Sequence, residues 1–125
     1  MITGGCLCGR VRYEARGEPL FCVVCHCRDC QKASGGGHMP VIGVRKADFS
    51  VTGALREYGV RAFCPHCGSM LLGLPRSAPE LITLYAGGID DPRLAFEPAY
   101  VQFTSHRREW DKLLFDCAQH PLSGQ

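Results

Sequence analysis

Seven of the nine cysteines fall into three tight clusters, and the spacing within each cluster is typical of metal ligands. The clusters are C-x-C at Cys6 and Cys8, C-x-C-x-x-C at Cys25, Cys27 and Cys30, and C-x-x-C at Cys64 and Cys67. Thiols this close in sequence suit one shared metal ion better than they suit neighbouring disulfides. A structural zinc has four protein ligands, whereas a catalytic zinc has three and an open position. Seven sulfurs can therefore supply one site of each kind.

The two distant pairs are expected to close a structural site, and the triplet is expected to form an open, reactive one. An alternative is that Cys22, three positions before Cys25, adds a fourth sulfur and closes the second site, which leaves no chemistry there. We favour Cys22 as a small buried residue of a strand, because free cysteine packs well in protein cores.

Other polar residues near the clusters receive structural interpretations. His26 and His66 lie between cysteines, but the sulfur count suffices without them, so both are interpreted as loop residues. Asp90 and Asp91 are best explained by the chemistry of a GGIDDP turn, with a general-base role as the minority interpretation. The glycines at 35–37 are expected to end a helix, and they are also candidates for the wall of a substrate pocket. Four isolated residues are assigned no role: Cys117, His38, His106 and His120.

The elements that must position the clusters are predicted to be short. The chain has 15 glycines and 8 prolines in 125 residues, which favours small strands and loops over long helices. A short helix is predicted over 28–34, and a second one is possible over 110–117. Alternating or short apolar runs predict strands over 10–15, 20–24, 39–44, 49–52, 55–58, 70–74, 81–86 and 99–104. We therefore expect one mainly β domain over residues 1–125, built around the metal.

Composition narrows the class of protein. The formal net charge is only +2 and the basic residues are scattered, so nucleic acid is not expected as a partner. The apolar runs are too short to cross a bilayer as helices, and the N-terminus lacks the basic and apolar regions of a secretory signal. These features predict reduced cysteines and a cytoplasmic protein.

The sequence resembles one known family, the glutathione-dependent formaldehyde-activating enzymes, whose domain also occurs in a centromere protein. The resemblance rests on GGCLCGRVRYEA, CHCRDCQKASGG, FCPHCGSML, AGGIDDP and Trp110. It implies an Mss4-like fold, in which small antiparallel sheets are organised around zinc with one or two short helices. It also implies the same division of ligands, with a structural zinc on the two pairs and a catalytic zinc on the triplet.

The resemblance further implies an activity. The family is named for adding formaldehyde to the thiol of glutathione, and the reverse reaction is that of a carbon–sulfur lyase. Zinc on the triplet would hold the thiol as a thiolate, because a metal lowers the pKa of a bound thiol. One alternative is a non-catalytic zinc module that binds a protein or small ligand, which ligation by Cys22 would favour. Another is a redox or metal sensor built on the triplet.

Overall fold

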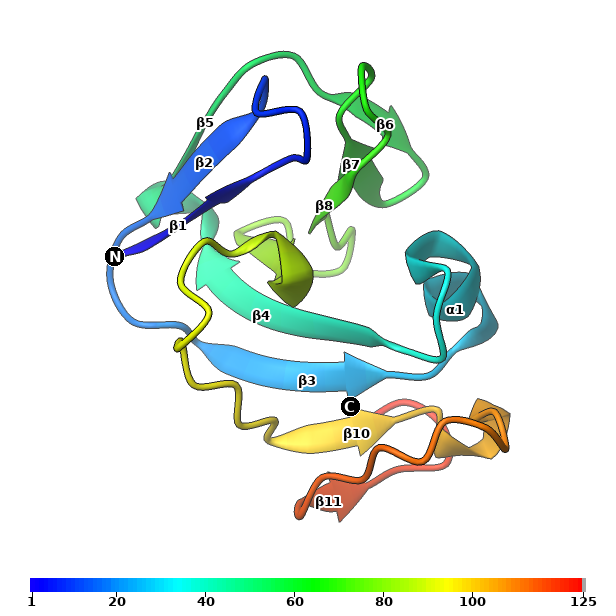
Figure 1. Ribbon diagram of the computed structural model, residues 1–125. Helices are drawn as coiled ribbons and strands as arrows, with labels where there is room; N and C mark the ends of the chain where they lie inside the picture. The colour runs from blue at the N-terminus through cyan, green and yellow to red at the C-terminus, as the bar shows by residue number, and fades with distance from the viewer. Residues whose placement is uncertain (125) are drawn as a thin grey trace.

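The computed structural model describes residues 1–124, which form two β-sheets and one α-helix (Figure 1). The helix α1 spans Arg28–Ser34, and three single 3-10 turns cover Lys46–Asp48, Ala86–Gly88 and Thr104–His106. The strands of the described chain are β1 (Ile2–Gly5), β2 (Arg12–Ala15), β3 (Phe21–Cys25), β4 (Met39–Arg45), β5 (Phe49–Thr52), β6 (Arg56–Tyr58), β7 (Arg61–Phe63), β8 (Met70–Gly73), β9 (Leu81–Tyr85), β10 (Tyr100–Gln102) and β11 (Ala118–Gln119). The mainly β, Mss4-like prediction is confirmed.

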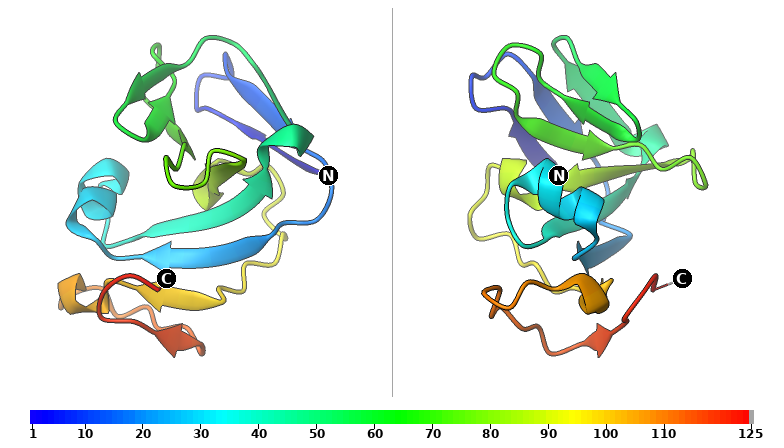
Figure 2. Two further views of the ribbon diagram at one scale, coloured as in Figure 1. Left: turned by 180° about the vertical axis from the view of Figure 1, so that it is seen from behind. Right: turned by 90° about the vertical axis from the view of Figure 1, so that its right-hand side faces the viewer.

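The larger sheet has the strand order β11-β10-β3-β4-β9-β8-β7-β6, and the smaller one has the order β1-β2-β5. Neighbouring strands are antiparallel except around β10, which runs parallel to both β3 and β11. Figures 1 and 2 show β10 beside β3, with α1 beyond the ends of β3 and β4. The smaller sheet lies over the part of the larger sheet that contains β4 and β8.

The core lies between the two sheets, and the alternation of side chains along each strand explains why. In β2, Tyr13 and Ala15 are buried while the residues before each of them are exposed. In the larger sheet, alternate residues of the central strands pack into the same core. Examples are Ile42 in β4 and Leu84 in β9, both of which are almost fully buried. This face of the larger sheet therefore belongs to the core.

The opposite face of the larger sheet turns away from the smaller sheet. In β3, Cys22 packs against the core, so the period of two places Phe21, Val23 and Cys25 on the other face. The chain then leaves β3 at Cys25 and enters α1 three residues later. The first cysteine of the triplet thus ends a central strand.

Helix α1 has the bounds that the sequence predicts, because both of its ends are capped. Cys27 is the N-cap residue, and its sulfur accepts a hydrogen bond from the backbone N–H of Cys30. Gly35 ends the helix in the left-handed conformation, with φ 74°. The buried Gln31 side chain donates to the carbonyl oxygens of His26 and His106 at 2.8 Å each, which ties α1 to the end of β10.

The expectation of a late helix over 110–117 is wrong. The segment is irregular, with a turn at 110 and bends at 116 and 117. Leu113 and Leu114 are exposed, so the segment buries no apolar stripe that would stabilise a helix. Sequence analysis also missed β1, β7 and β11. No helix of residues 1–124 is both long enough and apolar enough to cross a membrane.

Candidate metal centres

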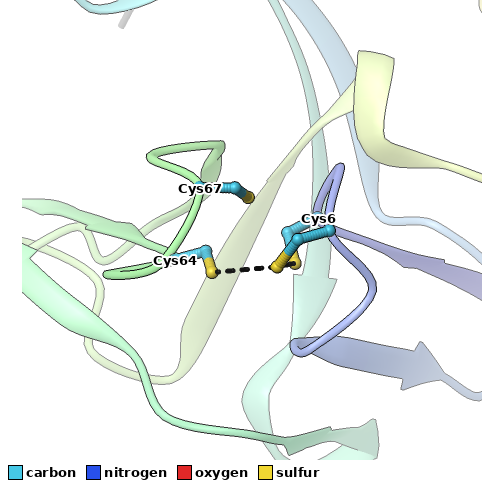
Figure 3. A group of neighbouring side chains, drawn as sticks. Cys6, Cys64 and Cys67 are labelled. Atoms are coloured by element: carbon cyan, nitrogen blue, oxygen red, sulfur yellow. Dashed lines mark hydrogen bonds between the residues drawn. The ribbon is translucent and has the colours of Figure 1, made fainter.

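The first candidate centre joins the two distant cysteine pairs. Cys6 and Cys8 lie in the loop between β1 and β2, and Cys64 and Cys67 lie in the turn between β7 and β8. All four sulfurs lie within 4.8 Å of one another, with Cys6 and Cys8 3.5 Å apart and Cys8 and Cys64 3.8 Å apart. Figure 3 shows the sulfurs of Cys6, Cys64 and Cys67 converging. Tetrahedral zinc with bonds of about 2.3 Å separates its sulfurs by roughly 3.8 Å, so the donor set fits zinc.

Ser69 joins the two turns that carry this centre. Its hydroxyl oxygen accepts a hydrogen bond of 3.0 Å from the backbone N–H of Leu7 and lies 3.2 Å from the Cys67 sulfur. The hydroxyl donates to that sulfur and lowers the pKa of the Cys67 thiol to about 5. Gly68, with φ 78°, takes the left-handed conformation that the CPHCG motif predicts. Ser69 therefore favours the thiolate form of Cys67, which is the form that binds a metal.

Burial differs among the four cysteines, since Cys6 and Cys64 are buried, Cys67 is half-buried and Cys8 is exposed. Cys6 and Cys64 belong to the hydrophobic core, and Cys64 is only 1% exposed. The backbone N–H of Val11 donates to the Cys6 sulfur at 3.3 Å, which positions it at the start of β2. Four sulfurs already complete a tetrahedron. A metal held here would fasten the loop of the smaller sheet to the turn of the larger sheet.

The second candidate centre is formed by the triplet at the junction of β3 and α1. The sulfurs of Cys25, Cys27 and Cys30 lie within 4.8 Å of one another. Cys25 ends β3, Cys27 caps the helix, and Cys30 lies in its first turn. A hydrogen bond from the Cys30 thiol lowers the pKa of Cys25 to about 6, and the same bond raises the pKa of Cys30. The donor set offers three sulfurs to one ion.

Cys22 does not complete this second centre. Its side chain packs against the core on the opposite face of β3, and the cluster of sulfurs contains only the triplet. The structure therefore does not bring Cys22 to the triplet, and it places this residue half-buried in β3 against the core. Three sulfurs leave a tetrahedral ion with one further position.

A cation and an amide lie beside the triplet. From β7, Arg61 donates through Nη2 to the Cys30 sulfur at 3.5 Å. The Nε of Arg61 is buried and has no hydrogen-bond partner among residues 1–124. On the other side, the Gln102 side chain forms a hydrogen bond to Cys25 that helps to lower the pKa of this thiol. If these three thiolates held one zinc ion, the site would carry a net charge of about −1, which the Arg61 guanidinium would offset.

His26, His38 and Asp111 form a third group of side chains, which sequence analysis did not find. His26, interpreted as a loop residue, lies between β3 and α1 but is only 1% exposed. Its Nδ1 lies 3.1 Å from the Gly37 carbonyl oxygen and 3.6 Å from Oδ2 of Asp111. His38 Nδ1 lies 2.8 Å from the same Oδ2 atom. The group therefore links the triplet loop, the glycine segment before β4 and the C-terminal region.

Burial and pairing explain the charges in this group. Burial lowers the pKa of His26, which favours the neutral ring. Burial also raises the pKa of Asp111, but the hydrogen bond and charge of His38 outweigh it, and the net pKa lies below the ordinary value. Asp111 follows the two histidines by more than 70 positions, and no local spacing signals such a contact.

Replacing Asp111 with asparagine should lower the free energy of unfolding by about 1–3 kcal/mol, because a hydrogen bond to a buried charged group is lost. Chemical denaturation of zinc-loaded protein measures this loss. The matched control is Asp116→Asn at an exposed position of the same segment, which should change stability by less than about 0.5 kcal/mol. Equal effects of the two substitutions would show that Asp111 does not fasten the segment.

The other polar residues and glycines considered in the sequence analysis lie outside the two cysteine centres. Asp90 accepts hydrogen bonds from Arg12 and from the Thr3 hydroxyl, and Asp91 accepts one from the Arg93 backbone, so turn and surface contacts account for both carboxylates. Gly37 lies so close to Asp111 that an added Cβ would come within 2.4 Å of the carboxylate oxygen. His66 is exposed beside the first centre, whereas His106 and His120 lie near the end of β10.

The fold and the two cysteine centres define a small β protein whose cysteine clusters could hold metal ions. The chain belongs to the glutathione-dependent formaldehyde-activating enzyme family, whose model matches residues 1–106. It is 32% identical over 104 residues to a protein of Halomonas elongata named "Putative glutathione-dependent formaldehyde-activating enzyme", covering 72% of this chain and 66% of that protein. A crystal structure of a Rhodobacter sphaeroides protein superposes with a TM-score of 0.57 at 25% identity, covering 73% of this chain and 92% of the other.

Proposed function

We propose that this protein catalyses the reversible addition of a small thiol to an aldehyde, as a zinc-dependent carbon–sulfur lyase. The observation that carries the proposal is the three-sulfur centre, since Cys22 faces away and the ligand set has room for a substrate thiolate. The family name and the name of the Halomonas relative support glutathione and formaldehyde as the pair to test first. The balanced reaction joins the thiol sulfur to the carbonyl carbon, and the thiol proton ends on the carbonyl oxygen.

We further propose the division of the ligands, with Cys6, Cys8, Cys64 and Cys67 holding a structural zinc. A second zinc on Cys25, Cys27 and Cys30 would lower the pKa of a thiol at its fourth position. The chain itself fixes the geometry of this site. Cys25 is held by strand pairing between β3 and its two neighbours, and Cys27 and Cys30 are held by the capped first turn of α1.

Arg61 and Gln102 are proposed as the residues that tune the site. Arg61 offsets negative charge by donating to the Cys30 sulfur, and Gln102 bonds to the Cys25 sulfur. Hydrogen bonds to a ligand sulfur reduce the charge that it passes to the metal, so an incoming thiolate is held more firmly. This chemistry requires reduced cysteines, which is the condition of the cytoplasm.

Metal analysis and a turnover assay together test the proposed function. Anaerobically purified protein should contain two zinc ions per chain, and it should accelerate the addition of a small thiol to 13C-labelled formaldehyde, followed by NMR, with glutathione as the first thiol assayed. One zinc per chain, with no acceleration for any thiol, would contradict the proposal. It would favour a non-catalytic zinc module instead.

Arg61→Gln should lower turnover by about 10–100-fold, the usual cost of losing a partner of a metal ligand. It should leave any zinc bound by the proposed four-sulfur centre in place, because Arg61 donates to Cys30 and not to that centre. The same assay with Arg56→Gln serves as the control, since Arg56 is exposed on the neighbouring strand β6. A wild-type rate in Arg61→Gln would remove Arg61 from the proposed site.

A further inference from the structure

A cavity beside the triplet opens on the face of the larger sheet that turns away from the core. Its volume is about 400 Å³, which lies within the range of about 300–1,000 Å³ for small-molecule pockets. Cys25 forms part of its wall. The residues around it come from β3, β4, β9 and β10 and from the segments at 75–78 and 123, so the cavity spans the middle of the sheet.

Apart from the Cys25 thiol, the side chains that line the cavity are all uncharged at neutral pH. Three aromatic rings contribute to it, and its polar groups are neutral hydroxyls and one amide. The residues that matter most for recognition are Phe21, Tyr100, Phe103, Thr83 and Gln102. No lysine, arginine, histidine, aspartate or glutamate of residues 1–124 lines this cavity.

Two unusual features of the backbone build this wall. Gly43 lies opposite Phe21 in the strand register, and a Cβ at Gly43 would come within 2.2 Å of the Phe21 ring, so only glycine leaves room for the ring there. Phe103 has φ 56°, a left-handed conformation that costs a bulky residue conformational energy. Strained residues of this kind concentrate at ligand sites, where the surrounding structure holds them in place.

The end of the described chain fixes the other side of the cavity. The backbone N–H of Phe103 donates to the Leu122 carbonyl oxygen at 2.9 Å, and the backbone N–H of Gly124 donates to Oε1 of Gln102 at 3.1 Å. With its oxygen held in this way, the Gln102 amide presents its N–H₂ group to Cys25. Residues 107–124 lie beyond the match to the family model, so this side of the cavity is supplied by a segment outside that match.

We infer that the thiol used by this protein is uncharged and carries an apolar or aromatic group, which occupies this cavity while its sulfur reaches the triplet. This inference rests on the proposed function. Glutathione carries two carboxylates and one ammonium group, and none of them meets an opposite charge on the wall. Placing an ionised group against such a wall costs its hydration without a compensating partner, whereas a phenyl group gains contacts with the three rings.

The nearest cation along the chain is Arg76, which lies between two residues of the wall, Pro75 and Ser77, but is itself exposed and not part of the wall. An anionic thiol would have to use this arginine from outside the cavity. The affinity for an anionic thiol should therefore depend on Arg76, whereas the affinity for a neutral thiol should not, and both affinities can be measured.

The test compares two thiols that differ by one carboxylate group, 2-phenylethanethiol and its para-carboxylate, with glutathione as the third probe. Cobalt is substituted for zinc, and binding is followed by the change in the sulfur-to-cobalt absorption band. The neutral thiol should bind at least about tenfold more tightly than its carboxylate and more tightly than glutathione. Arg76→Ala should leave the affinity for the neutral thiol unchanged.

Adding a positive charge at Ser77, which lines the cavity, should reverse the preference for the neutral thiol over its carboxylate. Ser77→Arg should raise the affinity for the carboxylate by about tenfold, and the uncharged control Ser77→Gln should not. Two results would contradict the inference while leaving the proposed function standing. One is that glutathione binds as tightly as the neutral thiol. The other is that the protein binds glutathione more tightly than the neutral thiol and that Arg76→Ala weakens only the binding of glutathione. A centre whose cobalt spectrum responds to no thiol would overturn both proposals.

Discussion

Cys64→Ser should leave the chain without a cooperative thermal transition at neutral pH. Binding of a structural zinc contributes about 10–16 kcal/mol to the folding of small metal domains, which is comparable with the whole stability of an ordinary domain, about 5–15 kcal/mol. Cys64 is 1% exposed, so the substitution also buries a hydroxyl in the core at the junction of the two sheets. Circular dichroism during heating, together with zinc analysis, measures the effect.

Cys117→Ser is the matched control for this experiment. Cys117 is half-buried in the C-terminal segment and belongs to neither cysteine centre. We expect its melting temperature to stay within about 4 °C of the wild-type value, since substitutions away from special features change stability by about 0.5 kcal/mol or less. A Cys64→Ser protein that melts like the wild type would show that the four-sulfur centre does not stabilise the fold.

Cys27→Ser should have the second large effect, on activity rather than on folding. Losing a partner of a metal ligand costs about 10–100-fold, so losing the ligand itself should lower turnover by more than about 100-fold. A serine at the N-cap keeps the helix start, because its hydroxyl can accept the Cys30 N–H that Cys27 accepts now. The melting curve should therefore stay close to that of the wild type, and the protein should lose one zinc and keep the other.

Cys22→Ala is the control for this substitution. Cys22 lies three residues before Cys25 but on the opposite face of β3, so its removal should cost some packing and leave turnover and zinc content unchanged. The division of roles between the two centres would be contradicted if Cys27→Ser and Cys64→Ser unfolded to the same extent. It would also be contradicted if Cys22→Ala released zinc.

Much of the secondary structure could be predicted because its signals are local. The helix over 28–34 ends at a left-handed glycine that is visible in the sequence, whereas its N-cap, Cys27, is not among the residue types that usually signal a helix start. The strand at β1 was missed because two of its four residues are glycines and its pairing with β2 is what makes it a strand. The parallel placement of β10 beside β3 depends on contacts between residues 77 positions apart, which no local pattern encodes.

Some residues of the candidate sites could likewise be predicted from local sequence patterns, and others could not. The cysteine clusters could be found from spacing alone, and the position of Cys22 follows from the alternation of side chains once β3 is known. The group of His26, His38 and Asp111 could not be found, because each residue comes from a different part of the chain. The uncharged cavity was equally invisible, since its wall combines alternate residues of four strands with the end of the described chain.

The position of β10 also matters while the protein is being made. Until residues 100–102 are synthesised, β3 has a neighbour on one side only, and its other row of N–H and C=O groups is open to any extended chain. Exposed strand edges of this kind are templates for aggregation. β10 thus covers the edge of β3 in addition to lining a cavity, and any product that stops before residue 100 would carry this edge unprotected.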